Sequence, residues 1–341
     1  MLERELTEPV DLCDRRGRLN PAATGWSRRP LHRANLRRAF GRKKRWDYWL
    51  VASPEVYVSL TYADVDYLGI ASVWVWEPAT DTVTEISRAV PFARGFALPD
   101  MACTGTMVHA DRRLRLEIEE RPEATRLHVL GRSAGGDVVV DLTVDRPAEH
   151  ETLSVVVPWS PRRFQYTSKH NTRPARGTVT VGERHYDVGP GAGGPAWGVL
   201  DLGRGVWPYA MRWNWAAASG TTPDGRVVGL QFGGKWTVGT GATENAVCVD
   251  GRLTKISDEL ELVYDWNHPL GPWRVRDTVG GLVDAVLTPV KDKHTRTSVG
   301  ILSMEVHQCF GTWSGRLRTA EGEEVPFEGL AGFAEEARNR W

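Results

Sequence analysis

Hydrophobic and polar residues alternate in short runs along most of this chain. The run "RRLRLEIEE" places Leu114, Leu116 and Ile118 between charged residues, and "DVVVDLTV", "TLSVVVPW" and "ELELVYDW" are built in the same style. Gly, Pro, Asp and Asn separate the runs, whereas long helical periodicity is almost absent. This spacing is typical of an all-β sandwich or barrel. The sequence therefore predicts an all-β protein with one short C-terminal helix, in "LAGFAEEARNRW".

A polar and basic segment, "WSPRRFQYTSKHNTRPARG", interrupts the alternating runs near the middle of the chain. Its lack of periodicity indicates a connection between two β halves, and the length of 341 residues also fits about two domains. We therefore predict a basic arm over residues 1–45, a first β-barrel-like domain over 46–165 and a second over 166–341, which includes the helix. Within the connection, His170 and Asn171 either close the mouth of a pocket or make backbone hydrogen bonds in an ordered loop.

The stretch "DLGRGVWPYAMRWNWAAASG" carries large side chains at every second position. In a continuous strand they would share one face, with Asn214 on the other. The members of this face are Trp207, Tyr209, Met211, Trp213 and Trp215. The chain has 15 Trp against 8 Phe and 8 Tyr, and indoles suit both cores and pockets for apolar ligands. We predict that this is the first strand of the second domain and that its aromatic face lines a cavity.

Charge changes this picture little. The formal net charge is +0, which argues against a dedicated nucleic-acid binder. Residues 27–45 nevertheless hold nine Lys/Arg and no acid. This segment is interpreted as an arm whose arginine stems pack on the barrel, with Leu31, Leu36 and Phe40 at roughly helical spacing. A transient contact of the arm with a membrane surface is the second interpretation.

Motifs and cysteines exclude several classes of protein. The four cysteines (Cys13, Cys103, Cys248 and Cys309) are far apart and without a CxxC pair, so we expect free thiols. The chain shows no signal peptide and no run of about 20 apolar residues, and we expect a cytoplasmic protein. Because phosphate loops, HExxH and GxSxG are missing, we expect no cofactor and no metal.

Three segments carry a resemblance to a known family. They are "TEPVDLCDRRGRLNPAATGWSRRPLHRANLR", "GRKKRWDYWLV" and "FGTWSGRLRTAEGEEVPFEGLAGFAEEARNRW". These resemble a bacterial family, domain of unknown function number 2804, over essentially the whole chain. More distantly, residues 177–232 are similar to the middle of the lipocalin-like group of carotenoid 1,2-hydratase, AttH-like proteins and calycin-type pericyclases. The resemblance implies two lipocalin-like β-barrels or sandwiches side by side, with a ligand cavity in or between them.

The distant resemblance places one acidic residue at a position of interest. In that group a Tyr-His-Asp-His-Asn-Trp-Gly element precedes a Trp-rich strand, and Asp201 lies where its aspartate would be. Val199, Leu200 and Leu202 stand around Asp201 here, so the tyrosine and both histidines of the element are missing. If buried among indoles, Asp201 would have a raised pKa and could donate a proton. Alternatively it accepts backbone N–H groups in a turn, or pairs with Arg204.

Two further segments supply candidate acid–base groups. "LVYDWNHPLGPWRVRD" holds Tyr264 and Asp265 as catalytic candidates, and Trp266 and His268, together with Asn214, as candidate ligand-binding residues. The segment also fits a loop with capped turns. In "SMEVHQCFGTW", Glu305, His307 and Cys309 share one face of a strand that points either into a barrel or to solvent. Glu305 and His307 alone supply only two ligands for a metal ion.

These residues support three functional hypotheses. In the first, the chain is a cofactor-free hydratase, cyclase or isomerase acting on an isoprenoid, fatty or polyketide-like molecule. Asp201 donates the proton, Tyr264 and Asp265 position water or a counter-charge, and the aromatic face holds the substrate. In the second, the protein is a non-catalytic carrier of a hydrophobic small molecule. The third is a carbohydrate-active or sugar-binding protein, since indoles stack on sugar rings.

Overall fold

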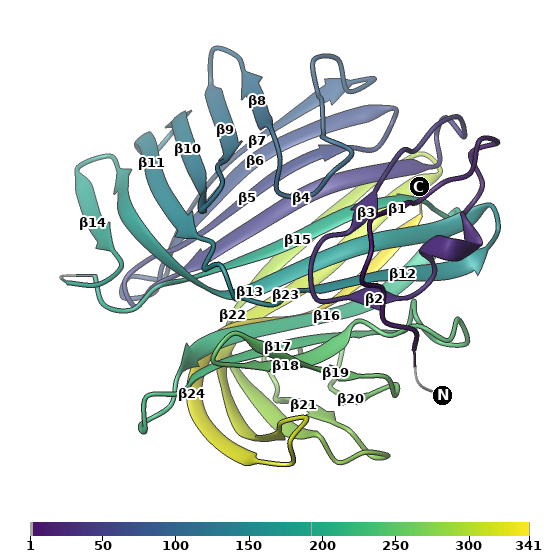
Figure 1. Cartoon of the computed structure of the whole chain (residues 1–341). Helices are drawn as coiled ribbons and strands as arrows, with labels where there is room; N and C mark the ends of the chain where they lie inside the picture. The colour runs from purple at the N-terminus through teal and green to yellow at the C-terminus, as the bar shows by residue number, and fades with distance from the viewer. Residues whose placement is uncertain (1–2, 192, 341) are drawn as a thin grey trace.

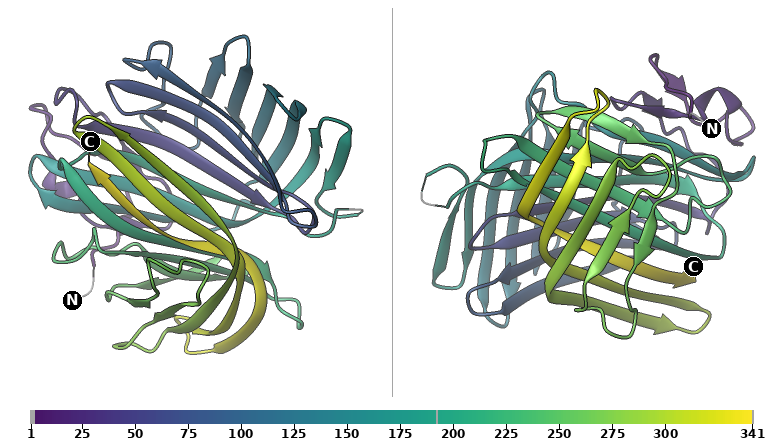
Figure 2. Two further views of the ribbon diagram at one scale, coloured as in Figure 1. Left: turned by 180° about the vertical axis from the view of Figure 1, so that it is seen from behind. Right: turned by 90° about the horizontal axis from the view of Figure 1, so that it is seen from below.

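Two large antiparallel sheets lie side by side in the computed structural model, which describes residues 3–191 and 193–340 (Figures 1 and 2). Over these residues the only helical element is the 3-10 turn η1 (Pro21–Ala23). A small additional sheet pairs β1 (Val10–Asp11) with β3 (His32–Arg33) in parallel. The prediction of an all-β fold is confirmed.

The first sheet follows one continuous path. Its ten strands, in spatial order, are β7 (Thr82–Pro91), β6 (Leu68–Glu77), β5 (Tyr57–Asp64), β4 (Lys43–Ala52), β15 (Trp197–Val206), β13 (Arg163–Val181), β11 (Gly136–Asp145), β10 (Ala124–Ser133), β9 (Leu114–Glu120) and β8 (Thr106–Ala110). Off this path, β12 (Leu153–Ser160) and β14 (Arg184–Val188) pair with β13, and β2 (Trp26–Ser27) pairs with β12.

The second sheet is formed by the remaining strands. In spatial order they are β19 (Arg252–Ile256), β18 (Asn245–Val249), β17 (Val227–Gly234), β16 (Ala210–Thr221), β24 (Glu324–Arg340), β23 (Leu302–Arg318), β22 (Val283–Val299), β21 (Trp273–Arg276) and β20 (Glu261–Val263). The predicted C-terminal helix is wrong, because its residues 330–340 lie in β24, while its last residue, Trp341, lies outside the described residues. There they pair with β16 on one side and β23 on the other, which satisfies the backbone on both edges.

The chain crosses from one sheet to the other at residues 207–209, between β15 and β16. The boundary expected between residues 165 and 166 falls within β13, which belongs wholly to the first sheet. The polar segment interpreted as a connection is therefore itself strand. Its alternation is hidden because Lys169 and Asn171 replace apolar residues on one of its faces.

Each sheet curls around its own core, and the faces turned away from these cores pack together. Alternation along one strand shows this division, since Trp49 belongs to the first core whereas its neighbour Leu50 belongs to the contact between the sheets. Leu50 shares that contact with Trp215 and Phe333 of the second sheet. Two hydrophobic layers thus flank an aromatic middle layer.

The N-terminal arm contacts both halves through Arg28. Arg28 forms ion pairs with Glu5 and Glu151 and donates a hydrogen bond to the Leu253 carbonyl of the second sheet. The expected amphipathic piece is not formed, because Phe40 is 70% exposed while Leu36 packs on the first core. A membrane contact of the arm stays a prediction. Across the described residues, no helix is long and apolar enough to cross a bilayer.

Candidate functional site

A buried ammonium group joins two carboxylates where the sheets meet. Lys169 in β13 lies directly opposite Asp201 in β15, so both side chains leave the first sheet on the same face. The Lys169 Nζ lies 2.7 Å from Asp201 and 3.4 Å from Glu244 of the second half. It also lies 4.4 Å from the centre of the Trp215 ring. We call Lys169, Asp201, Glu244 and Glu335, with their indole partners, the inter-sheet cluster.

Indole N–H groups supply hydrogen bonds to each carboxylate of the inter-sheet cluster. Trp46 donates to Asp201 at 3.1 Å, and Thr167 donates to the same carboxylate at 3.3 Å. The other two donors are Trp236 to Glu244 at 3.0 Å and Trp213 to Glu335 at 3.1 Å. The high tryptophan content therefore has a physical reason. An indole walls the cluster with apolar surface and still satisfies a buried acceptor.

Asp201 is neither a turn residue nor a partner of Arg204. It lies inside β15, and Arg204, three residues on, points to the opposite face of the sheet. There Arg204 donates to Asp47 at 2.6 Å. Both alternatives raised from the sequence are wrong. The pairing of Asp201 with Lys169 instead makes it the fixed counter-charge of a buried amine.

Burial shifts the acid–base behaviour of the cluster. Burial, opposed by Lys169, raises the pKa of Glu244 to about 7. Burial also raises the pKa of Glu335 to about 7, although the Trp213 hydrogen bond favours its charged form. Nearby, burial lowers the pKa of Lys293, whose Nζ donates to Ser59 at 2.9 Å, to about 8. Near neutral pH the cluster can therefore both hold and release protons.

Trp207 plugs the centre of the aromatic layer rather than lining a cavity. It is 1% exposed, and its ring contacts those of Trp46, Trp159, Trp213 and Trp236 at centroid distances of 5.2–5.6 Å. Trp46, Trp159, Met211 and Trp213 are only partly buried. The cluster consequently approaches the surface on the side where these residues lie.

The predicted aromatic face is only partly continuous. Trp213 and Trp215 lie on the same side of β16 and face the first sheet, as alternation requires. Trp207 and Tyr209 precede β16, and Tyr209 is exposed with its hydroxyl donating to the Ile301 carbonyl. Asn214 lies on the opposite face, as predicted, where it donates to Tyr264 at 2.8 Å.

Tyr264 belongs to a second group of polar residues, inside the curl of the second sheet. Its hydroxyl donates to Glu336, which also pairs with Lys235 at 2.8 Å and Arg338 at 2.7 Å. The Arg338 guanidinium lies 3.6 Å from the centre of the Trp266 ring. Because Glu335 and Glu336 are neighbours in β24, they point to opposite faces, and this group is separated from the inter-sheet cluster by the sheet itself.

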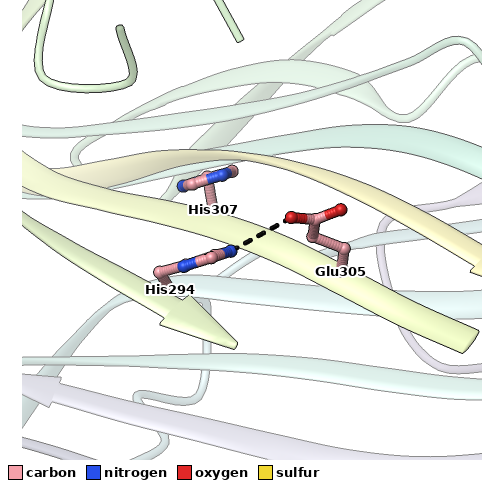
Figure 3. Close-up of side chains that lie close together, drawn as sticks. All are labelled: His294, Glu305 and His307. Atoms are coloured by element: carbon pink, nitrogen blue, oxygen red, sulfur yellow. Dashed lines mark hydrogen bonds and ion pairs between the residues drawn. The ribbon is translucent and has the colours of Figure 1, made fainter. Parts of the chain in front are cut away.

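His307 extends this second group, because its ring contacts that of Trp266 at a centroid distance of 4.5 Å. Glu305 and His294 lie beside His307 (Figure 3). His307 is opposite His294 of β22, and their rings stack in parallel with centroids 4.1 Å apart. His294 lies 3.3 Å from Glu305, and the Nδ1 of His307 lies 2.7 Å from Asp292. The strand face bearing Glu305, His307 and Cys309 is turned inward at Cys309, which lies in the second core, and at His307, which is 12% exposed. Glu305, nearer the strand end, is 30% exposed to solvent, so each of the two directions left open by the sequence describes part of this face.

His294 adds the third potential metal ligand that the spacing of β23 could not reveal. The three ligand atoms of His294, Glu305 and His307 lie within 4.8 Å of one another. A metal ion about 2.1 Å from each imidazole nitrogen must lie near the plane of each ring. Two parallel stacked rings cannot both meet this condition. As arranged, the residues form a hydrogen-bonded pair and a ring stack rather than a metal centre.

Asp265 and His268 lie apart from both groups. Their side chains are 56% and 81% exposed, and Asp265 accepts a hydrogen bond from the Asn267 N–H, as a capped turn does. The structure does not bring either residue to Asp201. For Asp265 and His268 the structure therefore agrees with a capped turn and not with a site beside Asp201.

Sequence reasoning missed three central members of the inter-sheet cluster. Lys169 lay in the presumed connection, Glu335 in the presumed helix, and Glu244 in a Gly/Thr-rich loop. Strand alternation through "RFQYTSKH" would have placed Gln165, Thr167 and Lys169 on one face. No sequence pattern indicates Glu244, because its position depends on how the halves pack.

The raised pKa of Glu335 predicts a pH-dependent difference between two neighbouring glutamates. Its folded pKa of about 7 lies above the unfolded value of about 4.3, so its protonation stabilises the folded state at low pH. Relative to Glu335→Gln, the wild type should lose about 1–3 kcal/mol of unfolding free energy from pH 5 to pH 8. Denaturant unfolding at both pH values measures this.

Glu336→Gln provides the matched control. Although burial opposes it, hydrogen bonds from Arg338, Lys235 and Tyr264 lower the pKa of Glu336, so its contribution is already complete above about pH 5. The difference between wild type and Glu336→Gln should therefore stay constant from pH 5 to pH 8. Equal pH dependence of the two variants would contradict the assignment of a raised pKa to Glu335.

Comparisons with known proteins identify the family of this chain and neighbours among solved structures. A family model described as Domain of unknown function (DUF2804) matches residues 3–341. Among solved structures, a putative AttH from Nitrosomonas europaea is 13% identical, with a TM-score of 0.51 over 87% of this chain and 92% of that chain. Kievitone hydratase from Nectria haematococca is 11% identical, with a TM-score of 0.49 over 87% and 88%. A search of the curated proteins finds no match. The likeness to the AttH structure shows a shared fold of two lipocalin-like halves.

Proposed function

Because this chain belongs to the family described as Domain of unknown function (DUF2804), and because its fold is lipocalin-like, we propose a function from the chemistry of the inter-sheet cluster. The protein binds a small, largely apolar molecule beside this cluster and catalyses a cofactor-free proton transfer, as in a hydration, cyclisation or isomerisation. The observation that carries the proposal is a pair of indole-walled carboxyl groups, Glu244 and Glu335, each with a pKa of about 7.

Glu335 is the proton donor in this proposal. A general acid works best when its pKa lies near the working pH, and Glu335 meets this condition through burial. Trp213 and Gln308 hold its two oxygens at 3.1 and 3.0 Å, so the carboxyl group is fixed in one orientation. Asp201, the donor expected from the sequence, keeps the role of counter-charge to Lys169.

The indole walls supply the second part of the chemistry. Protonation of an alkene or a polarised carbonyl group develops positive charge on the substrate, and an aromatic face stabilises a nearby cation. Trp213 and Trp46 are the partly buried indoles next to Glu335 and Asp201. They would contact an apolar substrate that enters from the partly open side of the cluster.

Deuterium incorporation tests the proposal across a range of candidate substrates. The protein is incubated in D₂O with a panel of unsaturated isoprenoid, fatty and polyketide-like carbonyl compounds, without added cofactor. We expect at least one compound to gain deuterium, or the mass of D₂O, faster than with heat-denatured protein. Mass spectrometry of the extracted compound provides the measurement.

The alternative functions give different results in the same experiment. A carrier would bind panel members, seen as quenching of tryptophan fluorescence, without any gain of deuterium. A sugar-binding protein would respond to oligosaccharides and leave the apolar panel unbound. Either result would contradict proton-transfer catalysis on an apolar substrate.

A further inference from the structure

The wall of the first sheet has a window in the middle of β13. From Val181 to Ala175 this strand pairs with β11, and from Lys169 to Arg163 it pairs with β12 along the same edge. Residues 170–174 between these stretches have no strand partner on that edge within the described part of the chain. The window exists because the pairing of β13 with β11 stops at Ala175, whereas its pairing with β12 stops at Lys169.

A cavity of about 1110 Å³ lies at this window. None of its lining residues belongs to the inter-sheet cluster. Its lining includes six arginines and two histidines but only two acids, Glu123 and Asp145. Small apolar residues such as Ala102, Ala124 and Ala148 complete the walls. The volume suits a small organic molecule, since ligand pockets span about 300–1,000 Å³.

Most arginines of the cavity are neutralised by nearby acids. Arg28 pairs with Glu151, and Arg146 pairs with Glu120. On the rim, Arg121 pairs with Glu119 and the half-exposed Arg176 pairs with Asp145. These pairs leave little net charge at their own positions. Of the two remaining arginines, Arg29 is exposed to solvent and Arg173 is buried, so Arg173 is the lining cation that lacks a counter-charge in a buried place.

Arg173 is a buried cation without a carboxylate partner among the described residues. It is 1% exposed, its Nε donates to the Asp145 carbonyl at 2.7 Å, and its Nη2 donates to the Val144 carbonyl at 3.1 Å. The buried Nη1 has no hydrogen-bond partner. Burial lowers the pKa of Arg173 only to about 10, so the group stays charged at neutral pH. The guanidinium also lies 5.3 Å from the centre of the Trp49 ring, but a buried cation without a counter-charge is costly unless a ligand supplies one.

His170 offers a second unused polar atom in the same cavity. It is 2% exposed, and its Nε2 lies 3.0 Å from the Ser168 hydroxyl, while its Nδ1 has no partner. Burial and the neighbouring Arg173 lower the pKa of His170, so the ring is neutral near pH 7. With Nε2 accepting from Ser168, Nδ1 carries the proton and can donate it to a ligand.

A strained bulge holds these two side chains in place. The register shift between His170 and Arg173 leaves Thr172 with a φ of 52°, an outlier for a β-branched residue. Contacts from the second half compensate, because the Thr172 N–H donates to Ser219 at 2.9 Å and the Asn171 side chain donates to the Leu230 carbonyl at 3.0 Å. Bulges of this kind often re-aim side chains at functional sites.

We propose that this cavity binds an organic anion, with a carboxylate or phosphate group on Arg173 and His170 and an apolar body against the cavity wall. The site goes beyond the proposed proton-transfer function and does not depend on it, because it uses other residues on another face of β13. A guanidinium with a free Nη1 and a neighbouring N–H donor matches the oxygens of either anion.

Isothermal titration calorimetry of the full chain tests this site with decanoate, decyl phosphate, decanol and inorganic phosphate. We expect decanoate or decyl phosphate to bind at least about 10-fold more tightly than decanol. The variant Arg173→Met should weaken binding of that anion by about 10- to 100-fold and leave decanol unaffected. The two anions distinguish a carboxylate ligand from a phosphate ligand. Only the anion that the site prefers should bind the wild-type protein at least about 10-fold more tightly than decanol.

Arg176→Met is the matched control, because Arg176 is a rim arginine already paired with Asp145. It should change the affinity less than about twofold. If Arg173→Met does not fold, Arg173→Lys keeps the charge but loses the fork, and a weaker anion affinity is then expected. Equal affinities for decanol and the anions, equal effects at Arg173 and Arg176, or binding of inorganic phosphate alone would each overturn the proposal.

Discussion

Replacing Lys169 with methionine is expected to lower the free energy of unfolding by about 3–5 kcal/mol. The methionine side chain preserves most of the volume, so the loss is electrostatic rather than a cavity effect. Asp201 and Glu244 would remain buried at 8% and 1% exposure without the ammonium group that lies between them. Removing one partner of a buried ion pair leaves an uncompensated charge, which is the costly case. Urea-induced unfolding at pH 7 measures the change.

The pH dependence of this loss separates the electrostatic cause from a packing cause. Burial raises the pKa of Glu244 to about 7, so its protonation toward pH 5 removes one uncompensated charge, and the effect of Lys169→Met should be smaller at pH 5 than at pH 8. Lys291→Met is the control, since Lys291 pairs with the exposed Asp81 and should cost at most about 1 kcal/mol. A loss at Lys169 that is the same at pH 5 and pH 8 would contradict the charged network.

The fold could be predicted well from local patterns but not in every element. Period-two alternation indicates strands whatever their partners, and this is why the all-β fold and the inward Trp213/Trp215 face follow from the sequence. The segment "LAGFAEEARNR" fails because Ala, Glu and Arg favour helix. Pairing of β24 with β16 and β23 overrides that preference, since it satisfies both backbone edges at once.

The candidate site could be predicted only in part, because its charges converge through sheet register. Asp201 follows from a resemblance, but its partner Lys169 is fixed by the pairing of β13 with β15. Tyr264 and Asp265 looked like neighbours in one site, yet one lies inside the second sheet and the other on a surface turn. Residues far apart in sequence, such as Trp236 and Glu335, enter only when the halves pack.

Replacing Glu335 with glutamine is expected to have the largest effect on activity. The rate of deuterium incorporation into a compound identified with the D₂O panel should fall by about 10²- to 10⁴-fold, the usual contribution of a general acid. Glutamine keeps an oxygen for the Trp213 hydrogen bond but has no proton to transfer. The wild-type rate should decline as the pH rises through about 7, where Glu335 loses its proton, and the residual rate of the variant should not.

Glu336→Gln again distinguishes catalysis from stability. Glu336 is the next residue of β24, is buried to 1% exposure and points to the other face of the sheet. Its loss breaks contacts with Lys235, Arg338 and Tyr264 but removes nothing from the inter-sheet cluster. It should therefore lower the melting temperature without changing the pH profile of the rate. A Glu335→Gln protein that keeps the wild-type rate and profile would exclude Glu335 as the acid, because no other property of glutamine could replace the missing proton.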